Sequence, residues 1–319
     1  MIDRRPAALV RCTDAADVMD TVDFIRDHDL ELAIRGGGHS GAGLSLVHDG
    51  VTIDLSPMRW VRVDPVAKTA QVGGGTLLGD LDHAAHAFGS SGSFLPEDLN
   101  GFFAELVVPP GPPFPEEIHG HKMCGVVWCW TGDLERLEET FAPVQEPAPP
   151  AFHFTTPMLY PALQTMFDEL IPTGLQWYWR GDLFDRITDD SIDVHAKYAE
   201  ATPTDLSTLH LYPVDGTAHR VNHEDTAWGY RDAVWSGVIA GIDPEPANAE
   251  TIKRWTVDYW EALHPHSMGA AYVNFIGAGE PQHRVKATYR DHYDRLAAIK
   301  HTYAPHNLFH TNQNIAPAR

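Results

Sequence analysis

The sequence predicts an α+β protein in which a short unit of alternating strands and helices precedes an antiparallel sheet flanked by helices. Three observations support this fold class. Short apolar strands alternate with helical patterns over the first ninety residues, and a Gly/Ser run interrupts the chain at 89–93. From residue 94 onward the chain carries longer stretches rich in β-branched and aromatic side chains. We therefore expect a first unit over 1–89 and a second domain that begins at 94.

In the first unit, Thr13 and Asp14 are placed to cap a helix with Val18, Val22 and Ile25 at helical spacing. Short strands are expected at Leu32–Ile34, Val51–Leu55, Val61–Val63 and Ala70–Val72. The first and the last of these strands each lead into a run of three glycines. Thr76 is placed to cap a second helix.

The second part alternates strand and helix patterns less regularly. Strands are expected at Phe102–Val108, Cys124–Trp130, Leu175–Trp179, Thr208–Tyr212 and Val234–Ile242. Helices are expected at Leu134–Phe141, Leu159–Leu170 and Ala247–Leu263. A long final helix over Arg284–Tyr303 should end before Pro305, because a proline disfavours helical conformation in the residue before it.

Composition limits the possible functions. The 319 residues include 23 Lys and Arg against 44 Asp and Glu, a formal net charge of −21. Such a chain repels phosphate backbones, so we expect no nucleic-acid partner. No apolar run reaches the ~18 residues that span a bilayer, and the first residues lack the apolar core of a secretory signal. Three cysteines are few for a disulfide framework, so we expect reduced thiols and a cytoplasmic location.

The most informative local motif is the segment 35–43, in which Arg35, Gly36, Gly37, Gly38, His39 and Ser40 follow a predicted strand. Glycines let backbone N–H groups approach an anion, because no Cβ blocks the way. This is the chemistry that a pyrophosphate needs, and Arg35 could add positive charge. A glycine turn without a ligand remains an equal alternative. His39 is either an exposed loop residue or an imidazole held beside a cofactor.

Several motifs occur in an order that resembles one family. They are Arg35–Ser40, Val51–Ser56, Tyr272–Phe275, Tyr289–Leu296 and Ala304–Ile315. Together they resemble berberine-bridge-enzyme-like, FAD-linked oxidases, which have the vanillyl-alcohol-oxidase type of FAD-binding fold. The resemblance implies FAD as cofactor, held by 35–40 and attached covalently through His39. It also implies a small-molecule alcohol or amine substrate that passes a hydride to the flavin, with O2 as the final acceptor.

The same resemblance places further residues near the flavin. They are Tyr272, Asn274, Asn312 and Asn314. Tyr272 is then a candidate catalytic base, with a half-buried strand aromatic as an equal alternative. The substrate domain would cover 94–275, and a C-terminal segment at 276–319 would return to the FAD domain.

The chain departs from the family in its first domain. By the resemblance, we expect the family's initial helix and second FAD subdomain to be absent, with the substrate domain following Phe88 after the short Gly/Ser run. The prediction is therefore a truncated FAD-binding α/β subdomain joined to an antiparallel-sheet substrate domain. Apolar surface should be exposed around residues 70–100, which favours self-association. The alternative function is a non-catalytic or engineered deletion variant of the family that binds little or no FAD.

The segment 176–180 adds candidate substrate contacts. Strand alternation puts Tyr178 and Arg180 on one face, with Trp177 and Trp179 on the other. We expect the tryptophan face to be core and the Tyr178 face to line the substrate site, which makes Tyr178 a second candidate catalytic base. His210 and Tyr212 could line that same face; an ordinary solvated face is an equal alternative for it.

A metal centre is a third hypothesis. It would use His119, His121, Cys124 and Cys129, residue types that suit zinc. The odd spacing of the two cysteines puts them on opposite faces of a strand. We therefore predict no metal, and expect thiols in the core and imidazoles in loops.

Overall fold

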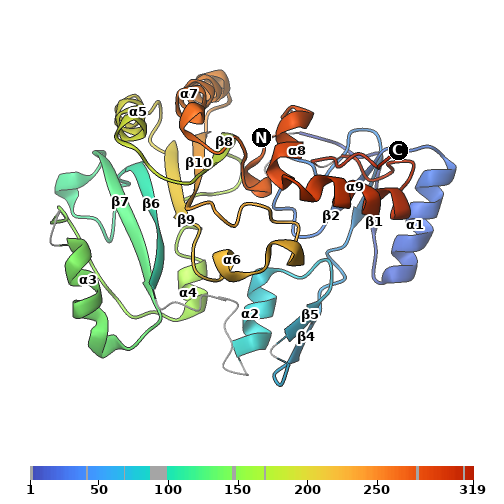
Figure 1. Cartoon of the computed structure of the whole chain (residues 1–319), viewed down its shortest axis with the longest axis horizontal. Coiled ribbons are helices and arrows are strands. Elements are labelled where there is room, and N and C mark those ends of the chain that lie inside the picture. The colour runs from blue at the N-terminus through green and yellow to red at the C-terminus, as the bar shows by residue number, and fades with distance from the viewer. Residues whose placement is uncertain are drawn as a thin grey trace. The chain divides into compact units, whose positions relative to one another are not determined.

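The computed structural model describes residues 3–40, 42–67, 69–86, 99–145, 149–168, 170–277, 280–311 and 313–319. The fold mixes helices with parallel and antiparallel strands, which agrees with the predicted class (Figure 1). The chain forms two compact units, here called unit 1 and unit 2. Unit 1 contains 1–94, 224–229 and 276–319, and unit 2 contains 95–223 and 230–275. The predicted Gly/Ser linker at 89–93 lies outside the described residues.

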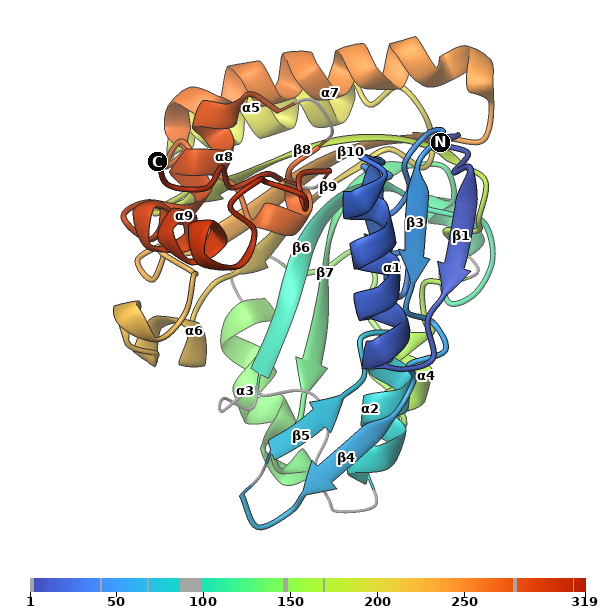
Figure 2. The same ribbon diagram turned by 90° about the vertical axis from the view of Figure 1, so that its right-hand side faces the viewer.

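Unit 1 is built on a three-stranded parallel sheet in the order β1-β3-β2. These elements are β1 (Ala8–Arg11), β2 (Leu32–Arg35), β3 (Val51–Asp54) and the helix α1 (Ala15–Asp27). Figure 2 shows α1 lying against β1 and β3, where Ile25 packs on Ile53 and its neighbours. Asp14 caps α1 as predicted, because its carboxylate accepts hydrogen bonds from the Ala16 and Asp17 amides.

The remaining elements of unit 1 are a hairpin of β4 (Val61–Asp64) and β5 (Thr69–Val72), and three helices. The helices are α2 (Leu78–His86), α8 (Gln282–Tyr289) and α9 (His292–Tyr303). The prediction of one helix over Arg284–Tyr303 is wrong, because the chain turns at Arg290, whose φ is +48°. Thr76 does not cap α2, since its hydroxyl donates to the Trp60 carbonyl.

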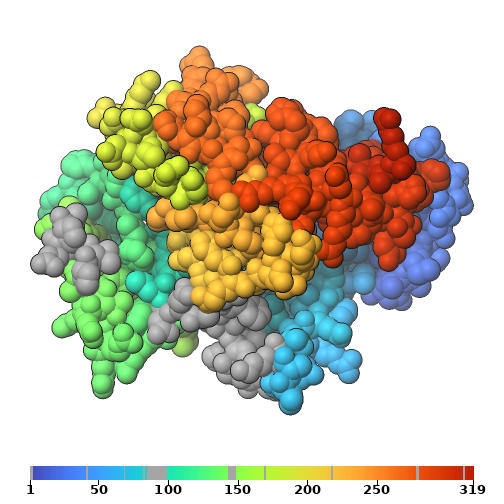
Figure 3. Space-filling view, in the orientation of Figure 1, coloured from blue at the N-terminus to red at the C-terminus, as the bar shows by residue number. Residues whose placement is uncertain are grey.

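Unit 2 contains a five-stranded antiparallel sheet in the order β7-β6-β9-β10-β8. The strands are β6 (Leu99–Val107), β7 (Lys122–Trp130), β8 (Gln176–Phe184), β9 (Thr208–Pro213) and β10 (Trp235–Asp243). The helices α5 (Asp189–Glu200) and α7 (Ala249–Leu263) cover one face of the sheet (Figure 1), and Figure 3 shows their outer surfaces side by side. The core of the unit lies under α7, where Tyr259 is fully buried.

The helices of unit 2 differ from the prediction in several places. The helix α5 was missed, although Thr188 and Ser191 form a reciprocal capping box at its start. The helix expected over Leu159–Leu170 is α4 (Tyr160–Gln164). Short helices α3 (Leu137–Gln145) and α6 (Thr217–Arg220) complete the unit.

The strand register defines two faces of the sheet. Glu105 on β6 lies opposite Leu209 on β9, which lies opposite Ile239 on β10, and this helix-covered face packs on α5 and α7. His210 lies opposite Val238 and belongs to the other face. We call this second face the aromatic face, because Phe102, His210 and Tyr212 share it.

Candidate functional site

Two glycine turns of unit 1 lie against each other. A Cβ added at Gly36 would come within 2.7 Å of the Gly74 carbonyl oxygen, and one added at Gly37 within 2.9 Å of the Leu77 side chain. On the second turn, a Cβ at Gly75 would lie 1.9 Å from the Leu55 carbonyl oxygen. Backbone atoms thus exclude a side chain at Gly36 and Gly75, whereas at Gly37 the Leu77 side chain would have to move.

The first turn presents a row of backbone donors. Among the described residues, the amides of 36–40 donate no hydrogen bond within the protein. Gly38 has φ +73°, a conformation that glycine adopts without strain. Consecutive amides with such a left-handed residue among them form a concave site that suits an anion.

The other residues of the motif have separate roles. The Arg35 side chain lies beside the turn, so that a Cβ at Gly38 would come within 3.2 Å of Arg35 Nε. The Ser40 hydroxyl accepts a hydrogen bond from the Leu44 amide at 3.0 Å and so fixes the end of the turn. His39 is exposed. The structure therefore brings Arg35 and the glycines together and leaves His39 on the surface of the same turn.

The aromatic face of unit 2 carries a row of rings. Phe102 on β6 lies 5.0 Å from His210 and 5.4 Å from Tyr212 between ring centroids. Phe167 packs on the same Phe102 ring at 6.0 Å, and Phe275 lies 5.9 Å from Tyr212. The row therefore joins the sheet to the helical turn η6 (Val273–Phe275).

His210 and Tyr212 form a hydrogen-bonded pair within this row. Nδ1 of His210 lies 2.8 Å from the Tyr212 hydroxyl. Burial lowers the pKa of His210 to about 4 and raises the pKa of Tyr212 to about 12. Both side chains are therefore neutral across the physiological pH range.

Tyr272 and Asn274 lie together at the end of the same row. The Asn274 side-chain amide donates a 2.7 Å hydrogen bond to the Tyr272 hydroxyl, and the Tyr272 ring meets Phe275 edge to face at 5.4 Å. A donor aimed at a phenol oxygen stabilises negative charge that develops there. The Tyr272 hydroxyl is therefore held in place by the side chain of Asn274.

The C-terminal amides lie in unit 1. Asn314 Oδ1 accepts a 3.4 Å hydrogen bond from Lys300 Nζ, and the Asn314 carbonyl accepts one from Gln282. Thr311 donates to the Leu32 carbonyl, which attaches this segment to β2. The predicted site residue Asn312 lies outside the described residues.

The prediction that Tyr178 and Arg180 share a face with His210 and Tyr212 is wrong. Arg180 lies opposite Ile239 in the register, so both it and Tyr178 belong to the helix-covered face. The Tyr178 ring lies 5.9 Å from Lys253 Nζ of α7. Strand alternation correctly separates the two faces, but it does not show which face the helices cover.

A buried polar network on the helix-covered face was not predicted. The Tyr259 hydroxyl donates to Glu105 Oε2 at 3.1 Å and lies 2.6 Å from His195 Nδ1. Burial raises the pKa of Glu105 to about 7 and lowers the pKa of His195 to about 4. A lone carboxylate inside the apolar run 102–108 is the signal that could have revealed this network.

The residues of the metal hypothesis do not converge. Among the described residues, His119, His121, Cys124 and Cys129 form no group of three or more converging ligand atoms. The expectation that both thiols lie in the core is wrong for Cys124, which is exposed on β7.

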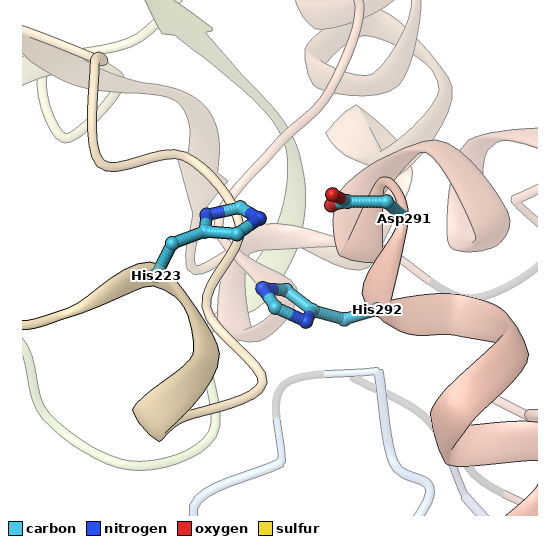
Figure 4. Close-up of side chains that lie close together, drawn as sticks. All are labelled: His223, Asp291 and His292. Atoms are coloured by element: carbon cyan, nitrogen blue, oxygen red, sulfur yellow. The ribbon is translucent and has the colours of Figure 1, made fainter.

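Figure 4 shows the side chains of Asp291 and His292 where α9 begins, together with His223. Asp291 and His292 belong to unit 1, whereas His223 is the last residue of a segment of unit 2.

Comparison with known families identifies two regions of the chain. Residues 6–101 match an FAD binding domain, and residues 271–316 match the berberine and berberine-like family. In the described part of the chain, no helix is both long enough and apolar enough to cross a membrane.

Curated relatives match parts of the chain. The (R)-6-hydroxynicotine oxidase of Paenarthrobacter nicotinovorans is 36% identical over 86 residues, which are 27% of this chain and 19% of that protein. An FAD-linked oxidoreductase of Dictyostelium discoideum is 28% identical over 160 residues, 50% of this chain and 34% of that protein. The matched segments thus span about a fifth of the first relative and about a third of the second.

Solved structures share the fold over nearly the whole chain. The 6-hydroxy-D-nicotine oxidase from Arthrobacter nicotinovorans has a TM-score of 0.73 at 17% identity, covering 99% of this chain and 93% of that one. The xylooligosaccharide oxidase from Myceliophthora thermophila has a TM-score of 0.79 at 13% identity, covering 98% and 92%.

Proposed function

We propose that this chain, which belongs to the berberine-bridge-like, FAD-linked oxidoreductases, oxidises a small alcohol or amine with FAD as its cofactor. The observation that carries this proposal is the row of backbone amides over 36–40, which donate no hydrogen bond among the described residues. The low cysteine content supports a reducing, cytoplasmic location as part of the proposal.

The residues of unit 1 fit one part of FAD, its pyrophosphate. Five amides, the Arg35 guanidinium and glycines without a Cβ give an anion both donors and space. We assign the pyrophosphate to 36–40 and Arg35. His39, exposed on the same turn, is the residue proposed to attach to the flavin covalently.

The chemistry divides between cofactor and chain. FAD, when bound, would supply the acceptor for the hydride of the substrate C–H bond, and O2 would take the two electrons together with two protons to give hydrogen peroxide. Tyr272, as its phenolate, is proposed to take the proton of the substrate hydroxyl or amine and so become a neutral phenol. Asn274 would stabilise the negative charge of the phenolate before that transfer. Tyr178 is not assigned this role, because its ring lies on the helix-covered face.

Chain length supports the proposed internal deletion. Because 86 residues are 19% of the (R)-6-hydroxynicotine oxidase, that protein has about 450 residues, about 130 more than the 319 of this chain. The shared fold spans 93% of the 6-hydroxy-D-nicotine oxidase chain, which leaves little of the difference for its ends. The length difference and the fold coverage both support the loss of an internal segment, which we assign to the second FAD subdomain.

A second candidate function is a protein of the same descent that binds little FAD. It is favoured by four apolar side chains beside the glycine turns, Trp60, Val72, Leu77 and Leu78, each between 42% and 52% exposed. Apolar surface of this kind is normally covered by a partner or by another part of the chain. A single remaining wall would hold FAD more weakly than a closed cleft does.

An absorption spectrum after incubation with FAD separates the two functions. After removal of free FAD, the oxidoreductase should keep a flavin absorption band, and acid precipitation should leave colour on the protein. His39→Ala should release that colour into the supernatant. Flavin that stays attached in His39→Ala contradicts the assignment of His39, and a colourless wild-type protein favours the second candidate.

A further inference from the structure

The sheet of unit 2 ends in two edge strands, β8 and β7, which differ in what lies beside them. At β8 the Leu183 amide donates to the Ala270 carbonyl at 2.7 Å, and the Met268 amide donates to the Leu183 carbonyl at 2.8 Å. The segment 268–270 therefore bonds to the outer side of β8. At β7, within the described part of the chain, backbone hydrogen bonds run only to β6. β7 is thus an edge whose outer backbone groups can pair with a further strand.

The outward backbone groups of β7 belong to alternate residues. The Val108 amide donates to the His121 carbonyl, so His121 faces β6, and every second residue after it along an antiparallel strand does the same. The side chains of the intervening residues lie on the helix-covered face, because Cys124 is opposite Glu105. These intervening residues turn their N–H and C=O groups away from β6; they are Lys122, Cys124, Val126, Trp128 and Trp130.

β7 lacks the features that commonly protect an edge strand, which are short length, bulges, prolines and several charges. It pairs with β6 over nine residues in a continuous register, and it contains no proline. Its only charged residue is Lys122, at its first position. Val126 is 46% exposed and Trp128 is 40% exposed. A strand added at this edge would therefore take up free hydrogen-bonding groups and cover apolar surface.

The order of the sheet indicates the kind of strand that this edge fits (Figure 1). β6 is followed by β7 and α3, as β9 is followed by β10 and α7, and β6 pairs antiparallel with β9 where the two halves meet. In the second half, β10 has a further neighbour, β8, which is antiparallel to it over nine residues. The corresponding position beside β7 therefore suits a nine-residue antiparallel strand.

We propose that the outer edge of β7 pairs with β7 of a second copy of this chain, antiparallel and about a twofold axis at Val126, so that the two five-stranded sheets become continuous. β7 has the nine residues that the position suits. An axis at Val126 pairs all nine, whereas any other axis leaves part of the strand without a partner. Because segment 268–270 bonds to the other edge of the sheet, association through β7 stops at two chains.

The residues that this axis brings together are compatible. Val126 lies opposite the partner's Val126, and Cys124 lies opposite the partner's Trp128. Lys122 lies opposite the partner's Trp130, so like charges do not meet. The net charge of −21 makes two copies repel each other, and β7 offers a contact segment that contains no acidic residue. A second copy is therefore the occupant that fits both the length and the charge of this edge.

Disulfide cross-linking at the axis tests the pairing and its register. With Cys124→Ser and Cys129→Ser as background, Val126→Cys puts two thiols opposite each other, on Cα atoms about 5.5 Å apart, which a disulfide can bridge. With oxidised glutathione as oxidant, the covalent dimer should form at least tenfold faster than with the matched control Ile192→Cys. Ile192 is 51% exposed on α5 of the same unit, and the remaining thiol, Cys12, is buried.

Sedimentation tests the contribution of the backbone. Each variant also carries Leu78→Lys, which puts a charge on the exposed apolar surface of unit 1. Val126→Pro removes an outward N–H and leaves the amides that face β6 in place, so the dimer dissociation constant should rise at least tenfold. The matched control Val126→Thr keeps the amide and the β-branched shape, and it should dimerise like the chain with Val126. Circular dichroism shows whether both variants fold.

Three results would overturn the proposal. The first is cross-linking of Val126→Cys no faster than that of Ile192→Cys, which is also the result expected if another protein or a peptide occupies the edge. The second is an equal dissociation constant for folded Val126→Pro and Val126→Thr. The third is an assembly larger than two chains that Val126→Pro abolishes. Because no measurement here uses FAD, failure of the β7 pairing would leave the proposed function unaffected.

Discussion

Gly36 and Gly75 show how far a single residue can be explained from the sequence. The motif 35–40 predicted a turn that presents backbone donors, and the structure has the amides of 36–40 without a hydrogen-bond acceptor among the described residues. The sequence could not show that Gly36 packs on the Gly74 carbonyl, because that contact joins residues almost forty positions apart. Local pattern thus predicted the chemistry of the turn, and tertiary packing explains its glycines.

At the same scale, Glu105 gives stability a dependence on pH. The ordinary pKa of this carboxyl is 4.5, and burial raises the pKa in the folded protein to about 7. The unfolded chain therefore loses the Glu105 proton first, and folding stability falls as the pH rises from 4.5 through 7. Burial instead lowers the pKa of His195 from 6.5 to about 4. The folding stability that depends on neutral His195 is therefore lost as the pH falls from 6.5 through 4.

Glu105→Gln should remove the alkaline loss of stability. The amide keeps an acceptor for the Tyr259 hydroxyl but cannot ionise. Urea unfolding should show the variant and the wild type similar at pH 5, with the variant more stable at pH 9 by up to about 3 kcal/mol. Parallel stability curves from pH 5 to 9 would contradict this account of Glu105.

At the scale of elements, most strands and the first helix follow from local sequence patterns. The point at which a helix is interrupted, and the sheet face that the helices cover, do not. The α1 start at Asp14 was predictable because the cap uses neighbouring amides. The break between α8 and α9 was not, since Arg290 adopts a positive φ that its residue type disfavours. Likewise, alternation in β8 could not show that α7 covers the Tyr178 face.

The C-terminus of α1 offers a test of backbone conformation. Asp29 follows the α1 C-cap residue His28 with φ +52° and is exposed. Glycine adopts this left-handed conformation without strain, so Asp29→Gly should stabilise unit 1 by ~1 kcal/mol and Asp29→Ala should not. Thermal unfolding of the two variants measures the difference. A melting temperature for Asp29→Gly at or below that of Asp29→Ala would refute the explanation.

At the scale of the whole molecule, the predicted exposure of apolar surface is confirmed for Val72, Leu77 and Leu78. The part of that prediction that falls on 87–98 lies outside the described residues. Resemblance to a family could predict this exposure, because it indicated what a longer relative would place there. It could not predict what covers the surface in solution.

We expect the chain to self-associate through this surface. Leu78→Lys should raise the monomer fraction in sedimentation experiments and lower the binding of a hydrophobic dye, because it puts a charge among the exposed side chains. Val66→Lys is the matched control, since Val66 is 92% exposed at the tip of the β4–β5 hairpin. If both substitutions act equally, the association does not use the surface beside the glycine turns.

The central claim is that the amides of 36–40 hold the pyrophosphate of FAD, and an FAD titration followed by calorimetry tests it most directly. The wild type should bind saturably, with a dissociation constant of about 1 μM or weaker because the proposed deletion would remove one wall of the cleft. Gly36→Ala should weaken binding at least tenfold, since its Cβ would meet the Gly74 carbonyl, while Gly79→Ala, whose Cβ would meet nothing within 4 Å, should bind like the wild type. Absence of saturable binding, or equal affinity of the two variants, would contradict the claim.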